Sequence, residues 1–325
     1  MDASSYKKLN TTRGYTYNYY SVPAADSKPT LLFLHGFPSS STDWRRIIEY
    51  FQPKGYGIIA PDNLGYAGTD KPADPKAYLG SALAKDLVEI LDAENIPKVI
   101  VVGHDWGTRP ESRLVNYFPD RVLGLAFITS GYIRPKSTYD LNALTAVTKQ
   151  LAGRELLGYW KFFAQDGSEK LVEEHFDSFF SLTFPHEPSL WRDNMCPTGA
   201  IEEWLKADKT APLPSYLTEE DKAAYKASLL AGGFEPLHNW WRVITQGLDF
   251  ADDDAIPEAA YPIQQPVFFA ASALDEACIP VLGTLGLKAF VKGPLTVKEF
   301  QADHWVILSH SQELSEALEK WIEGI

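Results

Sequence analysis

The sequence predicts an α/β fold with a mostly parallel, doubly wound sheet into which a helical domain is inserted. Apolar, strand-like runs alternate with amphipathic helical segments along residues 29–133, as in sheets whose parallel strands are joined by helices. From about residue 134 to 248 the periodicity is helical, and no strand is predicted before the alternation resumes. We therefore expect a core of residues 1–133 and 249–325. Residues 134–248 would form a helical cap over the carboxyl ends of the strands, where ligands of such folds bind.

The first elements follow from turn residues and periodicity. Residues 8–21 predict a hairpin, because Arg13-Gly14 supplies a turn between runs in which tyrosines alternate. The apolar runs 29–34 and 57–60 predict buried strands. Thr42 or Asp43 is expected to cap a helix that continues to Phe51. Residues 78–93 carry leucine and isoleucine at helical spacing, which predicts an amphipathic helix.

The run Val99-Ile100-Val101-Val102 predicts a strand buried on both faces, and it leads into Gly103-His104-Asp105-Trp106-Gly107. Gly-x-Asp-x-Gly fits the sharp strand-to-helix turn called a nucleophile elbow, with Asp in the usual place of Ser. A carboxylate at a helix N-terminus stays ionised and can attack carbon, which makes Asp105 a candidate nucleophile. The alternative is a helix N-cap without chemistry, because Asp is a favoured cap.

The remaining core elements come in the order expected of a parallel sheet. Pro110 falls in the first turns of the helix after the elbow, where we expect it to be tolerated. A strand is predicted at 122–129, and further strands at 266–272 and 296–300 precede a last helix at 312–322. The acidic residues at 249 and 252–254 are expected to lie in a solvated loop.

Composition narrows the class of protein. The 325 residues are 45% apolar and 13% aromatic, which provides a large core and excludes a disordered chain. A net charge of -13 argues against a nucleic-acid partner. Two cysteines, no apolar signal segment and no apolar run of about 20 residues predict a cytoplasmic protein without a membrane span. We find no metal-binding or cofactor-binding motif and expect neither group, and nothing specifies an oligomeric state.

A carboxylate nucleophile needs a base that completes the reaction and an acid that orients the base. In this architecture the chain order is nucleophile, acid, histidine. His304 follows a predicted strand and is preferred to His310, which precedes the last helix. Asp275 follows the preceding strand and is the expected acid, with Glu276 beside it as the alternative.

Together these residues resemble a known family. His35-Gly36-Phe37-Pro38, the elbow at 103–107, Asp275 and His304 are similar to the soluble epoxide hydrolases of the α/β-hydrolase fold, and most similar to fungal members. The segments 158–163 and 236–242 also fit the lid of that family, so the resemblance covers nearly the whole chain.

The resemblance implies an enzyme in which Asp105 attacks an epoxide carbon and forms an alkyl ester. His304, oriented by Asp275, would activate the water that hydrolyses this ester. The backbone N–H groups of Phe37 and Trp106 would form the oxyanion hole. Pro38 would shape the loop, as a cis peptide, and line the substrate pocket together with Trp241.

The sequence departs from the family at the lid. Two lid tyrosines are expected to donate hydrogen bonds to the epoxide oxygen, and Tyr159 matches the first of them. Trp241 stands where the second is expected, although the extra His238 leaves the register of this run open. An indole N–H donates a hydrogen bond but supplies no proton. Asp303, just before the histidine, would raise the pKa of that ring if it pointed inward.

We therefore expect a hydrolase that opens the epoxide of a small apolar or aromatic molecule. The alternative is a non-hydrolytic cyclase or isomerase of fungal natural-product metabolism on the same scaffold, which Trp241 favours and in which Asp105 or His304 would transfer a proton. A haloalkane dehalogenase is disfavoured because Phe37 stands where that family has a halide-binding donor. A receptor without catalytic activity is also disfavoured, because such a protein does not need the complete set of nucleophile, acid and base.

Overall fold

The computed structural model describes residues 1–136 and 140–325, and residues 137–139 of the predicted cap lie outside this description. The described strands form one eight-stranded sheet in the order β1-β2-β4-β3-β5-β6-β7-β8. Strand β2 runs antiparallel to both of its neighbours, β1 and β4, and all other pairs are parallel. The strands are β1 (Tyr6–Asn10), β2 (Thr16–Val22), β3 (Thr30–Leu34), β4 (Gly57–Pro61), β5 (Val99–His104), β6 (Val122–Ile128), β7 (Val267–Ser272) and β8 (Leu295–Phe300).

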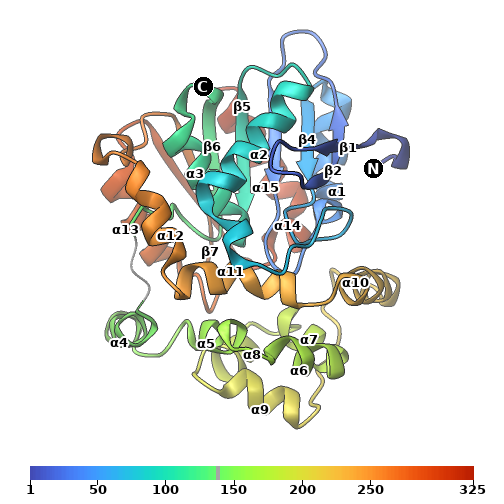
Figure 1. The fold of residues 1–325 in the computed structure, drawn as a ribbon, viewed down its shortest axis with the longest axis vertical. Helices are drawn as coiled ribbons and strands as arrows, with labels where there is room; N and C mark the ends of the chain where they lie inside the picture. Colours follow the sequence, from blue (N-terminus) through green and yellow to red (C-terminus); the bar gives the residue numbers. More distant parts are fainter. Residues whose placement is uncertain (137–139) are drawn as a thin grey trace.

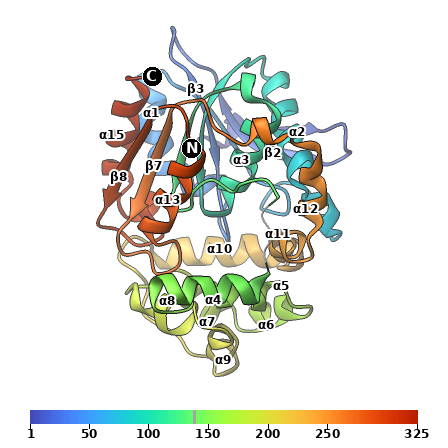
Figure 2. The same ribbon diagram turned by 90° about the vertical axis from the view of Figure 1, so that its left-hand side faces the viewer.

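Helices cover both faces of the sheet. The core helices are α1 (Arg45–Phe51), α2 (Gly80–Ala93), α3 (Thr108–Tyr117), α12 (Leu248–Asp252), α13 (Pro280–Phe290), α14 (Val306–Ser309) and α15 (Ser311–Ile322). Helices α2, α3 and α12 lie on one side of the sheet and α1 and α15 on the other (Figures 1 and 2). The α/β fold class predicted from the alternation of strands and helices is confirmed.

A second group of helices lies below the sheet in Figure 1. These are α4 (Leu141–Ala152), α5 (Gly158–Ala164), α6 (Ser168–Glu174), α7 (Phe176–Thr183), α8 (Ser189–Asn194), α9 (Ala200–Lys206), α10 (Glu219–Gly232) and α11 (Glu235–Thr245). Helices α10 and α11 lie between the sheet and the outer helices α5 to α9 (Figures 1 and 2). No strand interrupts them among the described residues 140–245. The exact boundaries at 133 and 249 stay a prediction.

Strand register brings the loops that matter to one edge of the sheet. Strands β3, β4, β5 and β7 are buried along their whole length, as their apolar runs predict. Leu34 of β3 pairs with Gly103 of β5, so the loops that follow these two strands start side by side. Ser272 of β7 pairs with Phe300 of β8 in the same parallel sense, so the segments carrying Asp275 and His304 also leave this edge together.

The start of α1 differs from the prediction. A 3₁₀ turn at Ser41–Trp44 precedes the helix, and the Ser40 hydroxyl accepts a hydrogen bond from the Thr42 N–H. The prediction that Thr42 or Asp43 caps the helix is therefore wrong. Asp43 is buried and accepts a hydrogen bond from the Tyr225 hydroxyl on α10, so its carboxylate serves a contact between core and cap.

The acidic segment after α11 also differs from its predicted role as a solvated loop. Asp249 lies in α12 and receives two hydrogen bonds from Arg109, at 2.8 Å from Nε and 2.6 Å from Nη2. Asp253 receives two from Arg113, both at 2.7 Å. All four residues are buried. Paired, bidentate geometry offsets the cost of removing these charges from water.

These ion pairs connect α3, the helix that follows Asp105, to both ends of the helical insertion. Arg113 donates a third hydrogen bond of 2.7 Å from Nη1 to the carbonyl of Ile133, on the segment that leaves β6. The Lys136 N–H donates to Asp253 Oδ2 over 2.8 Å. The segment entering the cap and the segment returning from it therefore meet on α3.

Replacing Asp253 with alanine should lower the free energy of unfolding by about 3–5 kcal/mol, because the substitution leaves Arg113 buried without its counter-charge. Asp254→Ala is the matched control, because this neighbouring carboxylate is two-thirds exposed and pairs with the exposed Lys136. Urea unfolding curves of both variants test this. Equal midpoints for the two variants would contradict a structural role for the buried pair.

Candidate active site

Asp105 occupies the tight turn between β5 and α3. Its φ is +52°, a left-handed conformation that a side chain other than glycine adopts only where the surrounding structure holds it. Gly107 is required because a Cβ atom there would overlap the Leu34 carbonyl, and a Cβ atom on Gly36 would overlap the Asp105 carboxylate. The elbow thus presses against the loop after β3, and the carboxylate is presented at the edge of the sheet.

The Asp105 carboxylate is held from two sides. Oδ1 accepts a hydrogen bond of 2.9 Å from the Phe37 N–H, and Oδ2 lies 3.3 Å from His304 Nε2. The Phe37–Pro38 peptide bond is cis. Burial alone would raise the pKa of Asp105, but His304, with lesser contributions from His104 and the Phe37 N–H, keeps it below its usual value. The carboxylate is therefore ionised and already oriented at neutral pH.

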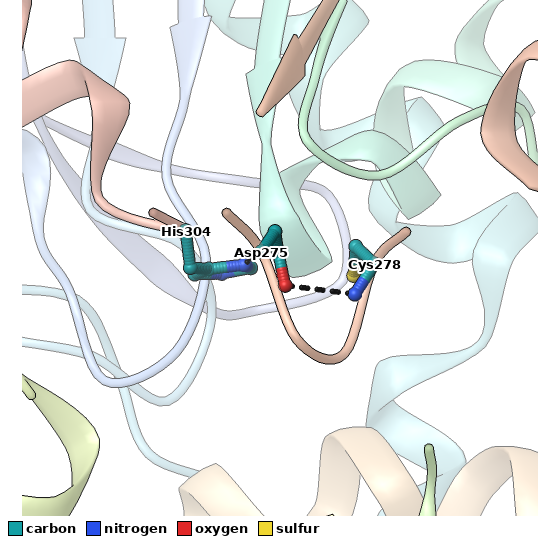
Figure 3. Close-up of side chains that lie close together, drawn as sticks. All are labelled: Asp275, Cys278 and His304. Atoms are coloured by element: carbon teal, nitrogen blue, oxygen red, sulfur yellow. Dashed lines mark hydrogen bonds and ion pairs between the residues drawn. The ribbon is translucent and has the colours of Figure 1, made fainter. Parts of the chain in front are cut away.

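His304 lies between two carboxylates. Its Nδ1 is 2.7 Å from Asp275 Oδ2, and Asp275 Oδ1 accepts a hydrogen bond of 2.8 Å from the Cys278 N–H (Figure 3). Asp275 Oδ1 also accepts one of 2.9 Å from the Ala277 N–H. Burial opposes the charged imidazole, but Asp275 and Asp105 outweigh it and raise the pKa of His304 well above its usual value. With both carboxylates ionised, the ring therefore carries a proton on each nitrogen.

The alternative residues Glu276 and His310, and Asp303 beside His304, have other partners. Glu276 forms an ion pair with Arg154 of the cap, and both side chains are mostly buried. His310 is at the start of α15, where its Nδ1 lies 2.9 Å from its neighbour Ser309 Oγ. Asp303 accepts hydrogen bonds from the Trp305 N–H at 2.9 Å and from a cap tyrosine hydroxyl at 3.3 Å.

Two further histidines of the predicted motifs bind backbone groups. His35 Nε2 accepts a hydrogen bond of 2.9 Å from the Asn63 N–H. His104 Nε2 donates over 2.9 Å to the carbonyl of His304, and burial lowers the pKa of His104 to about 4. His104 is therefore neutral and supports the loop that carries His304.

An aromatic cavity lies over Asp105 and His304. Its open volume is only about 20 Å³, close to the space that one water molecule needs. The lining residues are Phe37, Asp105, Trp106, Tyr159, Phe163, Thr183, Trp191, Met195, Trp241 and His304. Pro38, which was expected to line the substrate pocket, is not among them and instead lines a separate cavity of about 410 Å³ beside α10.

Tyr159 and Trp241 reach this cavity from α5 and α11. Burial, together with the nearby Cys278 thiol and Asp105 carboxylate, raises the pKa of Tyr159 well above its usual value, so its hydroxyl keeps its proton. The Trp241 ring packs edge-on against Phe37, with centroids 4.5 Å apart. Its buried indole N–H has no hydrogen-bond acceptor among the described residues.

Two neighbours of His304 were not singled out from the sequence. The Trp191 ring of α8 lies 4.8 Å from the imidazole, centroid to centroid. Trp191 is one of many aromatic residues between residues 134 and 248, and their spacing does not distinguish it from the others. Cys278 follows Asp275 by three residues, and this short separation is the one feature of the sequence that places it near the site.

Within the described part of the chain, no helix combines the length and apolar character that crossing a membrane requires.

Residues 29–311 match a family described as alpha/beta hydrolase fold. Epoxide hydrolase 2 of Siraitia grosvenorii is 33% identical over 223 residues, which cover 68% of each chain. Epoxide hydrolase B of Mycobacterium tuberculosis is 33% identical over 318 residues, covering 87% of this chain and 86% of that one. A haloalkane dehalogenase of Mesorhizobium japonicum is 44% identical over a shorter stretch of 119 residues, 37% of each chain.

The solved structure of Epoxide Hydrolase A from Mycobacterium thermoresistibile has the same fold, with a TM-score of 0.79, 24% identity and 98% of both chains covered. The family match extends over most of the chain and includes strands β3 to β8, the elbow and the helical insertion. The chain therefore belongs to the epoxide hydrolase family, a family of enzymes with the α/β-hydrolase fold.

Proposed function

We propose that this protein hydrolyses the epoxide of an apolar or aromatic molecule through an ester on Asp105. One observation carries the proposal: an ionised carboxylate is fixed between the Phe37 N–H and His304 beneath an aromatic cavity. A carboxylate in that position suits attack on carbon. The names of the relatives, epoxide hydrolases of a plant and of a bacterium, support the choice of substrate class.

In the first step a carboxylate oxygen of Asp105 attacks an epoxide carbon. The C–O bond of the ring breaks, and the electron pair goes to the epoxide oxygen. Tyr159 donates a hydrogen bond to this oxygen and delivers a proton, which its raised pKa keeps available. Trp241 can donate a second hydrogen bond through its unpartnered N–H but cannot deliver a proton. Tyr159 therefore carries the proton transfer alone.

Ester formation prepares His304 for the second step. It removes the negative charge of Asp105, one of the two carboxylates that raise the pKa of His304, so the ring loses its proton more easily. That proton replaces the one given up by Tyr159. Neutral His304, oriented by Asp275, then takes a proton from water, and the hydroxide attacks the ester carbon.

The products restore the starting state. The Phe37 and Trp106 N–H groups are the proposed donors to the oxyanion of the tetrahedral intermediate. Collapse of this intermediate releases the diol, regenerates the Asp105 carboxylate and leaves His304 protonated. The sum is epoxide plus water giving diol. Because the cavity holds about one water molecule, an epoxide can enter only when the surrounding side chains of the cap move.

Dehalogenation is a second candidate, favoured by the similarity to a haloalkane dehalogenase and by the unpartnered Trp241 N–H. A halide leaves without needing a proton, so an indole donor suffices for it. A non-hydrolytic isomerase would use the same side chains for proton transfer only. A substrate panel of aryl and alkyl epoxides together with haloalkanes separates the three: a diol gains the mass of water, a dehalogenated alcohol appears with free halide, and an isomer keeps its mass.

Reaction of an aryl epoxide in ¹⁸O-labelled water should give an unlabelled diol in the first turnover, because the transferred oxygen comes from Asp105. Label should then enter the Asp105 carboxylate and appear in later diol, which mass spectrometry of product and peptide detects. Asp105→Asn should reduce diol formation by at least roughly 10³-fold. Labelled diol in the first turnover would show direct attack by water instead.

His304→Gln should trap the ester, because attack on the epoxide uses Asp105 and the proton of Tyr159 whereas hydrolysis needs the base. The intact protein should gain the mass of one substrate molecule. The double variant with Asp105→Asn should gain none. An unmodified His304→Gln protein that also makes no diol would argue against the ester.

Tyr159→Phe should lower kcat for an epoxide by about 10²-fold, because the epoxide oxygen loses its proton source. Trp241→Phe removes a donor that transfers no proton, and its effect on kcat should be clearly smaller. Steady-state rates of the two variants make the comparison. Equal losses would assign the same role to both side chains.

A further inference from the structure

The thiol of Cys278 has no part in the proposed reaction, yet it lies beside the acid and the base. One ligand atom from each of Asp275, Cys278 and His304 lies within 4.8 Å of the other two (Figure 3). The Cys278 backbone N–H donates to Asp275 Oδ1, which fixes the cysteine at the turn after β7. The Cys278 Sγ atom is also 3.3 Å from Ser130 Oγ.

A thiolate, an imidazole and a carboxylate form a donor set that suits zinc. Zn²⁺ binds sulfur at about 2.3 Å and nitrogen or oxygen at about 2.0–2.2 Å in a tetrahedron, which places ligand atoms roughly 3.3–3.8 Å apart. The three donors would need to shift by roughly 1 Å from their present positions to reach this geometry. Magnesium and calcium prefer sets of oxygen ligands and would not gain from the sulfur.

We propose that Asp275, Cys278 and His304 bind a thiophilic divalent cation such as Zn²⁺, and that the bound ion blocks the enzyme. Binding replaces the proton shared by His304 and Asp275 and displaces the thiol proton, so protons are released. Water would complete the tetrahedron. The Ser130 hydroxyl, already next to the sulfur, would donate to the thiolate.

The bound ion would inhibit the enzyme because the two imidazole nitrogens of His304 have different partners. Nδ1 faces Asp275, and Nε2 faces Asp105. A neutral imidazole that binds the ion through Nδ1 must carry its remaining proton on Nε2. This nitrogen then has no free lone pair and cannot accept a proton from water. Asp275, held by the ion, no longer orients the ring.

The absorption spectrum of bound Co²⁺ tests the proposed ligands directly. Titration of the intact protein with Co²⁺ should produce the near-ultraviolet charge-transfer absorption of a thiolate–cobalt bond, and added Zn²⁺ should remove it by competition. Cys278→Ser should abolish this absorption and weaken Zn²⁺ binding by at least about 10-fold. Cys196→Ser is the matched control, because Cys196 is the other cysteine of the chain and its thiol instead donates to the Glu276 carbonyl.

Absence of the charge-transfer absorption in the wild-type protein would overturn the proposal, and so would its persistence in Cys278→Ser. Thermal unfolding shows whether Cys278→Ser is folded, and Cys278→Ala serves if it is not. This optical experiment needs no substrate, so it stands even if epoxide hydrolysis is not found. Where a substrate turns over, Zn²⁺ but not Mg²⁺ should inhibit, a chelator should restore the rate, and Cys278→Ser should need at least about 10-fold more Zn²⁺.

Discussion

The close approach of two backbone segments at the elbow is the constraint on which the rest of the site depends. Gly107 touches the end of β3 so tightly that no side chain fits, and Asp105 takes a left-handed conformation to make the turn. Both conditions follow from parallel pairing of β3 with β5, which brings their carboxyl ends together. The Phe37 N–H reaches Asp105 because of the same contact. A change in strand register would therefore displace Asp105, its hydrogen-bond donor and the cavity together.

Charge is arranged differently on the two sides of this turn. On one side, the imidazole of His304 lies between the carboxylates of Asp105 and Asp275. A proton gained or lost by one of these three groups therefore changes the pKa of its neighbour. Behind the turn, α3 carries two arginines that are locked by buried aspartates. Those pairs take no part in the chemistry. They hold the segments that enter and leave the cap against α3, the helix that follows Asp105, so the cap is anchored at the site it covers.

Much of the core could be predicted because its signals are local. The run Val99-Ile100-Val101-Val102 and the glycines around Asp105 specify a strand and a turn within nine residues. Asp275 and His304 could be paired because parallel strands end at one edge of a sheet. The buried ion pairs of Asp249 and Asp253 could not be predicted, because their arginines lie 140 residues away in the sequence and acidic runs are usually solvated. The size of the cavity also escaped prediction, because it depends on how ten side chains from several elements pack.

The insertion point of the cap has a consequence for synthesis on the ribosome. Strands β6 and β7 are neighbours in the sheet, but the whole cap is made between them. At a synthesis rate of roughly 5–20 residues per second, on the order of 10 s pass between the synthesis of β6 and that of β7. During that time an apolar strand has an open edge, the kind of surface that pairs with other chains. The nascent protein thus contains Asp105 long before Asp275 and His304, and its period of greatest exposure to aggregation ends only when β7 leaves the exit tunnel.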